Sequence, residues 1–185
     1  MKKVLFEIKH LLSVKENVVI AIDGMCASGK TTLANEIAKS FDCNVIHCDD
    51  FFLPKERSDE GRIAIPGGNI DCIRMKNEVI NKLDGNISYK KFDCKEQTYS
   101  DYINLEYKRL TVIEGCYALH PYFGEYYDYS IFVKIDPFTQ LERIEKRNGK
   151  EQVETFKNKW IALENKYFEA YEIEQLVNLV IDTGE

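Results

Sequence analysis

The chain has 185 residues, of which 44% are hydrophobic and 30% are charged, and its formal net charge is −6. A chain of this length buries enough apolar surface to fold as one domain without disulfides or a structural metal. The acidic balance argues against a nucleic-acid partner, because nucleic-acid-binding surfaces are basic. It does not argue against a small nucleotide, which backbone dipoles and one or two cations can hold.

The six cysteines include no CxxC pair, so we expect reduced thiols that pack as small apolar groups. Charged residues interrupt the apolar positions near the N-terminus, which argues against a signal peptide. No stretch approaches the roughly 18 apolar residues that a membrane span needs. We therefore expect a cytoplasmic protein with no membrane partner. Its oligomeric state is left open, with a homo-oligomer as one option.

Helical and strand patterns alternate along the chain. In chain order they predict a helix at 2–14, a strand at 18–22, a helix after residue 29, a strand at 44–48, a loop at 53–69, a helix at 70–83 and a hairpin at 86–107. Strands at 110–113 and 129–135, helices at 138–147 and 153–167 and a last strand at 176–181 follow. This alternation predicts one domain over residues 1–185, built on a parallel sheet with helices on both faces.

Acidic residues stand at the ends of three predicted strands, at Asp23, at the Asp49-Asp50 pair and at Glu114. Parallel sheets bind their ligands beyond the carboxyl ends of the strands. The candidate chemistry is therefore expected along one edge of the sheet.

The octapeptide GMCASGKT at residues 24–31 matches the phosphate-loop pattern G-x-x-x-x-G-K-[ST]. It follows a predicted buried strand and opens an amphipathic helix, which is the context that the pattern requires. Backbone N–H groups and the positive end of the helix would hold the phosphates of ATP, or alternatively of GTP. The expected phosphate contacts are Gly24, Cys26, Ala27, Ser28, Gly29, Lys30, Thr31 and Thr32.

Two oxygen-bearing side chains are placed to hold Mg²⁺. The Thr31 hydroxyl follows the loop lysine, and Glu114 ends a strand of the same predicted sheet. P-loop proteins hold Mg²⁺ with a hydroxyl from the loop and an acidic residue at a strand end. Glu114 alone could also be an ordinary solvated strand end.

Three classes of P-loop protein compete at this point: a small-molecule kinase, a GTPase switch, and a regulatory or transport ATPase module. The GTPase interpretation draws on Asn81-Lys82-Leu83-Asp84, which fits the guanine-specifying N-K-x-D pattern. That pattern should follow a buried strand, but here it ends an amphipathic helix, and the chain contains no Asp-x-x-Gly switch element. No further ATPase motif is present, so the kinase interpretation is favoured.

A kinase needs a base beside the acceptor hydroxyl and cations over the transferring phosphoryl group. Asp49 or Asp50 can act as the base, although adjacent aspartates can also form a cap or a turn. Arg143 and Arg147 lie one helical turn apart and precede Asn148-Gly149, a candidate hinge. We expect a helical lid at 138–150 that carries both arginines. A pair of arginines facing solvent is the alternative.

These residues resemble the uridine kinase and phosphoribulokinase group of P-loop kinases. The resemblance runs from about residue 18 to residue 181. It rests on DGMCASGKTT (23–32), HCDDFF (47–52), VIEGCY (112–117) and RIEKRNG (143–149). It implies a three-layer α/β/α fold with a five-stranded parallel sheet in the order 2-3-1-4-5, a β-hairpin insertion and an arginine-bearing lid.

By position in the family's motifs, Asp49 rather than Asp50 is the catalytic aspartate. The resemblance further implies ATP- and Mg²⁺-dependent phosphoryl transfer to a small molecule, in particular to the 5′-hydroxyl of uridine or cytidine. Asp71 matches the carboxylate that binds the ribose hydroxyls, although it could equally cap its own helix. Tyr89 and Phe92 of the hairpin could stack on the base, although cross-strand packing is the ordinary role of such residues.

The chain departs from the family at two places that concern the acceptor. Residues 65–71 read IPGGNID instead of the family's Asp-His-Pro-containing stretch. The hairpin segment FDCK at 92–95 lacks the histidine of pyrimidine-specific members. The acceptor therefore stays open between a nucleoside, pantothenate, nicotinamide riboside and a sugar phosphate. A non-catalytic nucleotide-binding module is the remaining alternative.

Overall fold

A computed structural model describes residues 1–184 of the chain. Its centre is a five-stranded parallel sheet in the spatial order β2-β5-β1-β6-β7. The strands are β1 (Val18–Gly24), β2 (Asn44–His47), β5 (Leu110–Glu114), β6 (Tyr129–Lys134) and β7 (Leu179–Asp182). Counted within the sheet alone, this is the order 2-3-1-4-5, and the predicted three-layer α/β fold is confirmed.

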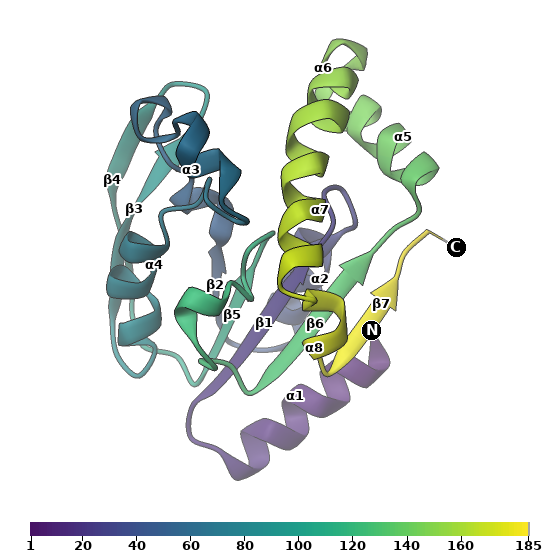
Figure 1. The fold of residues 1–185 in the computed structure, drawn as a ribbon. Coiled ribbons are helices and arrows are strands. Elements are labelled where there is room, and N and C mark those ends of the chain that lie inside the picture. Colours follow the sequence, from purple (N-terminus) through teal and green to yellow (C-terminus); the bar gives the residue numbers. More distant parts are fainter. Residues whose placement is uncertain (185) are drawn as a thin grey trace.

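Helices cover both faces of the sheet (Figure 1). The helices of the described residues are α1 (Lys2–Val14), α2 (Lys30–Ser40), α3 (Glu60–Ala64), α4 (Cys72–Glu78), α5 (Pro137–Asn148), α6 (Lys150–Thr155), α7 (Ile161–Ala170) and α8 (Ile173–Leu176), and not all of them lie on the sheet. Within β1, Ile20 and Ile22 pack toward α1 and α2, whereas Val19 joins the core on the face of α4 and α7. Alternate residues of a strand point to opposite faces, so a continuous apolar run is what a strand covered on both faces requires.

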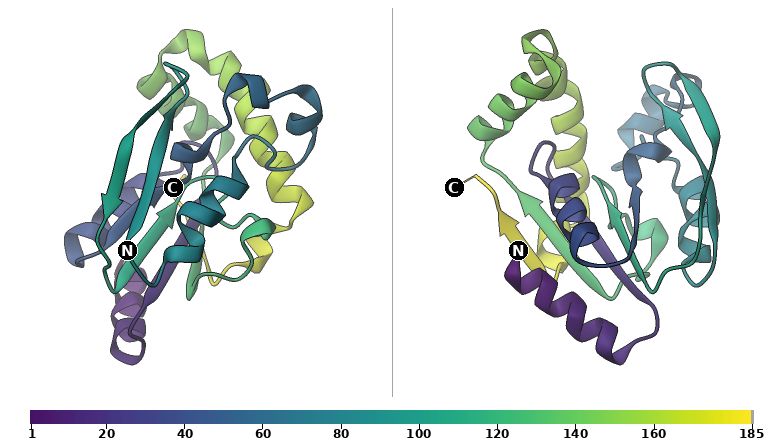
Figure 2. Two further views of the ribbon diagram at one scale, coloured as in Figure 1. Left: turned by 90° about the vertical axis from the view of Figure 1, so that its left-hand side faces the viewer. Right: turned by 180° about the vertical axis from the view of Figure 1, so that it is seen from behind.

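The predicted hairpin is observed as β3 (Ile87–Asp93) paired antiparallel with β4 (Thr98–Leu105). Ile87 and Tyr89 face the core, while Tyr102 on β4 is exposed. Figures 1 and 2 show the hairpin with α3 and α4 on one side of the molecule, and α5, α6 and α7 on the other.

Three predicted elements differ from the observed ones. The segment 53–69 contains the short helix α3 rather than loop alone, and α4 ends at Glu78 instead of continuing to residue 83. A 3₁₀ turn at Ile80–Lys82 keeps Ile80 and Leu83 in the core, so the apolar spacing imitates a longer helix. The last strand begins at Leu179 rather than at residue 176. Leu176 is the last residue of α8 and is exposed to solvent.

Helix α6 runs without a break into α7 through a π-helical segment at Phe156–Trp160 (Figure 1). The wider π turn shifts the side chains that follow it around the helix axis. Trp160 and Glu164 both reach the cavity described below, and they come from this joined helix. Within residues 1–184, no helix has the length and apolar character needed to cross a bilayer.

Candidate active site

The phosphate loop connects the end of β1 to the start of α2. Gly24 has φ +137°, and a Cβ there would lie 2.1 Å from the carbonyl oxygen of Val133 in β6. Only glycine tolerates both the backbone angle and this close approach. The next residue, Met25, donates its N–H to the same Val133 carbonyl at 3.0 Å, so the neighbouring strand fixes where the loop begins.

Groups outside the loop bind its carbonyl oxygens. Gln140 donates to Cys26 O at 2.9 Å, and the Thr183 hydroxyl donates to Ser28 O at 2.7 Å. Arg143 donates to Ala27 O at 3.3 Å. The C=O and N–H of one peptide group point in opposite directions. Carbonyls held on the outside of the loop therefore turn the N–H groups of the same peptides inward, which is the arrangement of an anion-binding nest.

Lys30 lies across the loop, and its Nζ donates to the carbonyl oxygens of Gly24 and Met25 at 2.8 Å each. Burial alone would lower the pKa of Lys30, but attraction to Glu164 and other acidic groups outweighs burial and raises it. The ammonium group therefore stays charged. It is positioned to exchange these two carbonyl contacts for the oxygens of a phosphate.

Thr31 and Glu114, predicted as the Mg²⁺ ligands, lie together: the Thr31 hydroxyl donates to Glu114 Oε1 at 3.0 Å. The same oxygen lies 2.5 Å from Nδ1 of His47, and this hydrogen bond raises the pKa of His47. Among residues 1–184 no group of three acidic, histidine or cysteine side chains could hold a metal by itself. Two oxygen donors beside a phosphate site fit Mg²⁺, which takes its other ligands from phosphate and water.

Asp49 and Asp50 have different surroundings. Asp49 follows β2 and lines the same cavity as the phosphate loop, with its side chain open to solvent. Loss of hydration between the walls of the cleft raises the pKa of Asp49, and the attraction of Lys30 partly opposes this. Asp50 is buried, accepts from the Tyr89 hydroxyl at 3.2 Å and pairs with Lys91 at 3.3 Å. Only Asp49 is therefore available to a substrate in this cavity.

The two predicted lid arginines both face the phosphate loop from α5. Arg143 donates to the carbonyl oxygen of Thr183 at 2.8 Å as well as to the loop. One Arg147 nitrogen lies 3.5 Å from the sulfur of Cys26, and the guanidinium stacks over Phe156 at 5.7 Å. Both side chains line the cavity rather than pointing only to solvent.

The cavity itself has a volume of about 680 Å³. It is lined by the phosphate-loop residues Cys26, Ala27, Gly29, Lys30, Thr31 and Thr32, by Asp49, Glu114, Arg143, Arg147 and Glu164, and by a wall that includes Phe52, Asn69, Tyr117, Phe156 and Trp160. The phosphate loop, the carboxylate of Asp49 and an aromatic wall therefore share one space. A volume of this size accommodates a small organic molecule.

The three residues expected to bind the acceptor do not line this cavity. Asp71 is buried, accepts from the Arg74 N–H at 3.1 Å as a helix cap and pairs with Arg57 at 2.9 Å. Tyr89 stacks on Phe51 at 5.1 Å in the core. Phe92 is buried too, against Tyr99 of the paired strand at 5.1 Å between ring centroids. Asp71 is therefore a helix cap, Tyr89 is a core residue, and Phe92 packs across the two strands of the hairpin.

Asp23 is a structural residue. It is fully buried, and its two oxygens accept from the N–H groups of Gly24, Tyr117 and Leu119 and from the Tyr167 hydroxyl at 2.7–3.2 Å. Burial raises its pKa against these hydrogen bonds. Asp23 thus ties the start of the phosphate loop to the segment after β5 and to α7.

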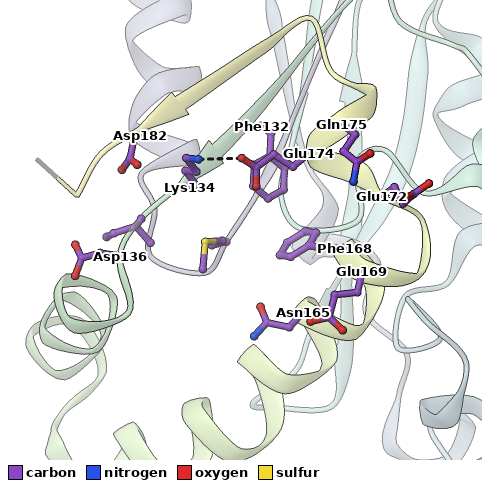
Figure 3. A pocket seen from close by; sticks show the side chains of 12 residues that line it. Phe132, Lys134, Asp136, Asn165, Phe168, Glu169, Glu172, Glu174, Gln175 and Asp182 are labelled. Carbon is purple, nitrogen blue, oxygen red and sulfur yellow. Dashed lines mark hydrogen bonds and ion pairs between the residues drawn. The ribbon is translucent and has the colours of Figure 1, made fainter.

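A second cavity, of about 630 Å³, lies beside the ends of β6 and β7 (Figure 3). Its walls carry the acidic side chains Asp136, Asp182, Glu169, Glu172 and Glu174. The lining cation Lys134 is paired with Glu174 at 2.9 Å. Like charges repel in a shared cavity, so this space disfavours a polyphosphate and does not compete for the nucleotide.

Glu164 is the most prominent site residue that the sequence did not indicate. It comes from α7, and its Oε2 accepts from the Cys26 N–H at 2.8 Å, within the phosphate loop itself. Burial raises the pKa of Glu164 to about 7, against the attraction of Lys30. Glu164 is 138 residues away from Cys26 in the sequence, and only the tertiary fold brings the two together.

We expect nucleotide binding to become weaker above pH 7, and we expect Glu164→Gln to remove this dependence. An incoming phosphate adds negative charge beside Glu164, Asp49 and Asp23, so binding favours the protonated Glu164. At a pH above the pKa of Glu164, the protein must take up a proton in order to bind the nucleotide. The affinity for MgADP should therefore fall by up to about tenfold per pH unit. Titration calorimetry from pH 6 to 9 measures this effect. Equal pH profiles for the wild type and the variant would contradict it.

The sheet order and the phosphate loop define the class of a P-loop NTPase domain. The model of the family described as "AAA domain" matches residues 20–181, which is most of the chain, and the chain therefore belongs to this family. A comparison with curated proteins found no match.

Two solved structures resemble the fold over nearly its whole length. One is described as a possible uridine kinase from Bacillus stearothermophilus, with a TM-score of 0.70, 20% identity and 96% of each chain covered. The other is a provisionally assigned fructose transport system kinase from Silicibacter sp. TM1040, with a TM-score of 0.72 and 20% identity. That match covers 96% of this chain and 97% of the other. At this identity the likeness concerns the fold, which is a kinase-like P-loop fold.

Proposed function

We propose that the protein is a Mg²⁺-dependent kinase that transfers the γ-phosphoryl group of ATP, or alternatively GTP, to a hydroxyl of a small molecule. The 5′-hydroxyl of a pyrimidine nucleoside is the first candidate acceptor. The observation that carries this proposal is the shared cavity: Asp49 and the phosphate loop open onto the same space. A carboxylate beside a phosphate site is the pairing that phosphoryl transfer to a hydroxyl requires.

In this proposal, Asp49 accepts the proton of the acceptor hydroxyl as the oxygen forms its bond to the γ-phosphorus. The bond from that phosphorus to the bridging oxygen breaks, and the nucleoside diphosphate leaves. Lys30, Arg143 and Arg147 stabilise the negative charge on the transferring group. The raised pKa of Asp49 favours its role as a base. Bound Mg²⁺, held by Thr31, Glu114 and the phosphates, would neutralise charge on the β- and γ-oxygens.

The aromatic wall of the cavity supports a ring-containing acceptor. The ring of Phe52 contacts both Tyr117 and Trp160, at centroid distances of 6.5 and 6.2 Å. Aromatic side chains offer a large apolar surface on which a planar base can stack. The fold neighbour described as a possible uridine kinase is consistent with this choice.

The proposal is tested by following ADP release from ATP and Mg²⁺ in the presence of single acceptors. The panel contains uridine, cytidine, adenosine, guanosine, nicotinamide riboside, pantothenate and fructose 1-phosphate. We expect strong stimulation by at least one acceptor and slow hydrolysis without it. Clear nucleotide binding with no stimulation by any acceptor would favour the regulatory-module alternative.

A further inference from the structure

The positive charges of the active-site cavity are gathered at the phosphate loop. Among the described residues that line this cavity, the cations are Lys30, Arg143 and Arg147. Each of them contacts the loop: Lys30 and Arg143 donate to its carbonyl oxygens at 2.8 and 3.3 Å, and an Arg147 nitrogen lies 3.5 Å from the sulfur of Cys26. In the proposed complex with MgATP, all three cations therefore bind the phosphates of the nucleotide.

The wall on which an acceptor would lie carries negative charge and aromatic surface instead. Asp49, Glu164 and Trp160 all line it. Glu164 stands where the phosphate loop meets the aromatic wall: its Oε2 accepts from the Cys26 N–H at 2.8 Å, and Trp160 precedes it by one helical turn. Burial first, and then repulsion from Asp49 and Asp23, raises the pKa of Glu164 to about 7 against the attraction of Lys30. The two carboxylates of the cavity are therefore close enough to feel each other.

The neighbouring segments carry further cations, but these are paired elsewhere. Arg57 pairs with the buried Asp71 at 2.9 Å, and Arg62 Nε donates to Gly68 O at 2.9 Å. Lys91 of β3 is likewise paired with a buried aspartate, at 3.3 Å. None of the three lines the cavity. A negatively charged group on an acceptor would thus meet no cation in the described lining except those that hold the nucleotide.

We propose that the acceptor carries no phosphate or carboxylate, and that Glu164 is a specificity-determining residue that rejects such anionic molecules. This inference rests on the proposed kinase function and narrows its acceptors to uncharged or cationic hydroxyl compounds. An anionic acceptor would bring negative charge close to Glu164, Asp49 and the γ-phosphate in a cavity partly shielded from water, where like charges repel strongly. Rejection by an unfavourable charge is a common source of specificity. Pantothenate and sugar phosphates are therefore disfavoured, and the nucleosides are retained.

Matched acceptors that differ in one anionic group test this inference before the acceptor is known. The pairs are uridine and orotidine, which bears a ring carboxylate, pantothenol and pantothenate, and fructose and fructose 1-phosphate. Binding is measured by calorimetry at pH 8, where Glu164 is ionised, with Mg²⁺ and the β,γ-imido analogue of ATP. The analogue fills the γ-phosphate position, so the cations of the phosphate loop are not free to hold the acceptor. In any pair that binds, we expect the neutral member to bind roughly 100-fold more tightly.

Glu164→Gln removes the charge, and its amide oxygen can still accept from the Cys26 N–H. We expect the ratio of the two affinities in a pair to fall roughly tenfold in this variant. The ratio cancels any general effect of the substitution on the site, so a merely structural role would not change it. Glu169→Gln, in the same helix and exposed to solvent, changes the net charge equally and should keep the wild-type ratio. An equal ratio in the wild type and in Glu164→Gln would overturn the inference.

Turnover of the same pairs with ATP separates this inference from the kinase proposal. Preferential binding of the neutral members without turnover would retain the inference and reject the kinase. Preference for an anionic member, with turnover, would reject the inference and retain the kinase. Absence of both binding and turnover for every member would overturn both proposals.

Discussion

Replacing Asp49 with asparagine is expected to lower kcat for phosphoryl transfer by roughly 10²–10⁴-fold, the usual contribution of a general base. The affinity for ATP should change little, because in the proposed complex Asp49 contacts the acceptor hydroxyl and the phosphate loop contacts the nucleotide. Asparagine has nearly the same shape as aspartate, so the cavity should keep its form. Steady-state kinetics with the best acceptor, together with calorimetric titration of ATP, measure the two quantities separately.

The adjacent aspartate provides a matched control for this result. Asp50 is 2% exposed and contacts Tyr89 and Lys91 instead of the cavity. Asp50→Asn should lower the free energy of unfolding by about 1–3 kcal/mol and leave kcat within a few-fold of the wild type. If Asp50→Asn abolishes transfer while Asp49→Asn does not, the assignment of the base is off by one residue.

Replacing Lys30 with alanine is expected to weaken ATP binding by roughly 10- to 150-fold, which corresponds to the loss of charged hydrogen bonds worth about 1.5–3 kcal/mol. The value of kcat should fall as well, by on the order of 10²–10³-fold, because Lys30 also stabilises charge that develops during transfer. In the absence of nucleotide, its ammonium donates to Gly24 O and Met25 O. Two loop carbonyls therefore lose a partner in the variant, and the loop should become more mobile.

Lys39→Ala in the same helix is the control for the change of charge. Lys39 is exposed and pairs only with Glu36 on the surface, at 2.6 Å. Exposed pairs of this kind contribute about 0–1 kcal/mol, so nucleotide affinity and kcat should both be unchanged. Equal effects of the two substitutions would mean that net charge, rather than the position of Lys30, decides nucleotide binding.

The sequence was sufficient for the features that depend on local pattern. The apolar run at 18–22, the glycines of the phosphate loop and the acidic strand end at Glu114 predicted where a parallel sheet would bring phosphate-binding groups together. The resemblance to P-loop kinases added the strand order, which no local pattern carries. The distinction between Asp49 and Asp50, which the residues alone left open, follows from the single-residue alternation of burial at this turn.

The residues of the acceptor side could not be predicted in this way. Tyr89 is an aromatic residue of a correctly predicted hairpin, yet the face on which it lies packs into the core. Asn69 and Glu164 are polar residues with no motif around them, and their positions in the cavity depend on contacts between segments distant in sequence. For Asp71 the sequence allowed two roles, ribose binding and helix capping. The hydrogen bond that Asp71 accepts from the Arg74 N–H is that of a helix cap.

The central claim is that Asp49 and the phosphate loop act on one acceptor hydroxyl in one cavity. Its most direct test is the fate of the γ-phosphoryl group when ATP labelled with ¹⁸O at its γ-phosphate is incubated with Mg²⁺, the enzyme and the nucleoside panel. Mass spectrometry should find three labelled oxygens in a nucleoside 5′-monophosphate, and Asp49→Asn should abolish that product. Label recovered only in inorganic phosphate, at a rate independent of every acceptor and of Asp49, would contradict the account.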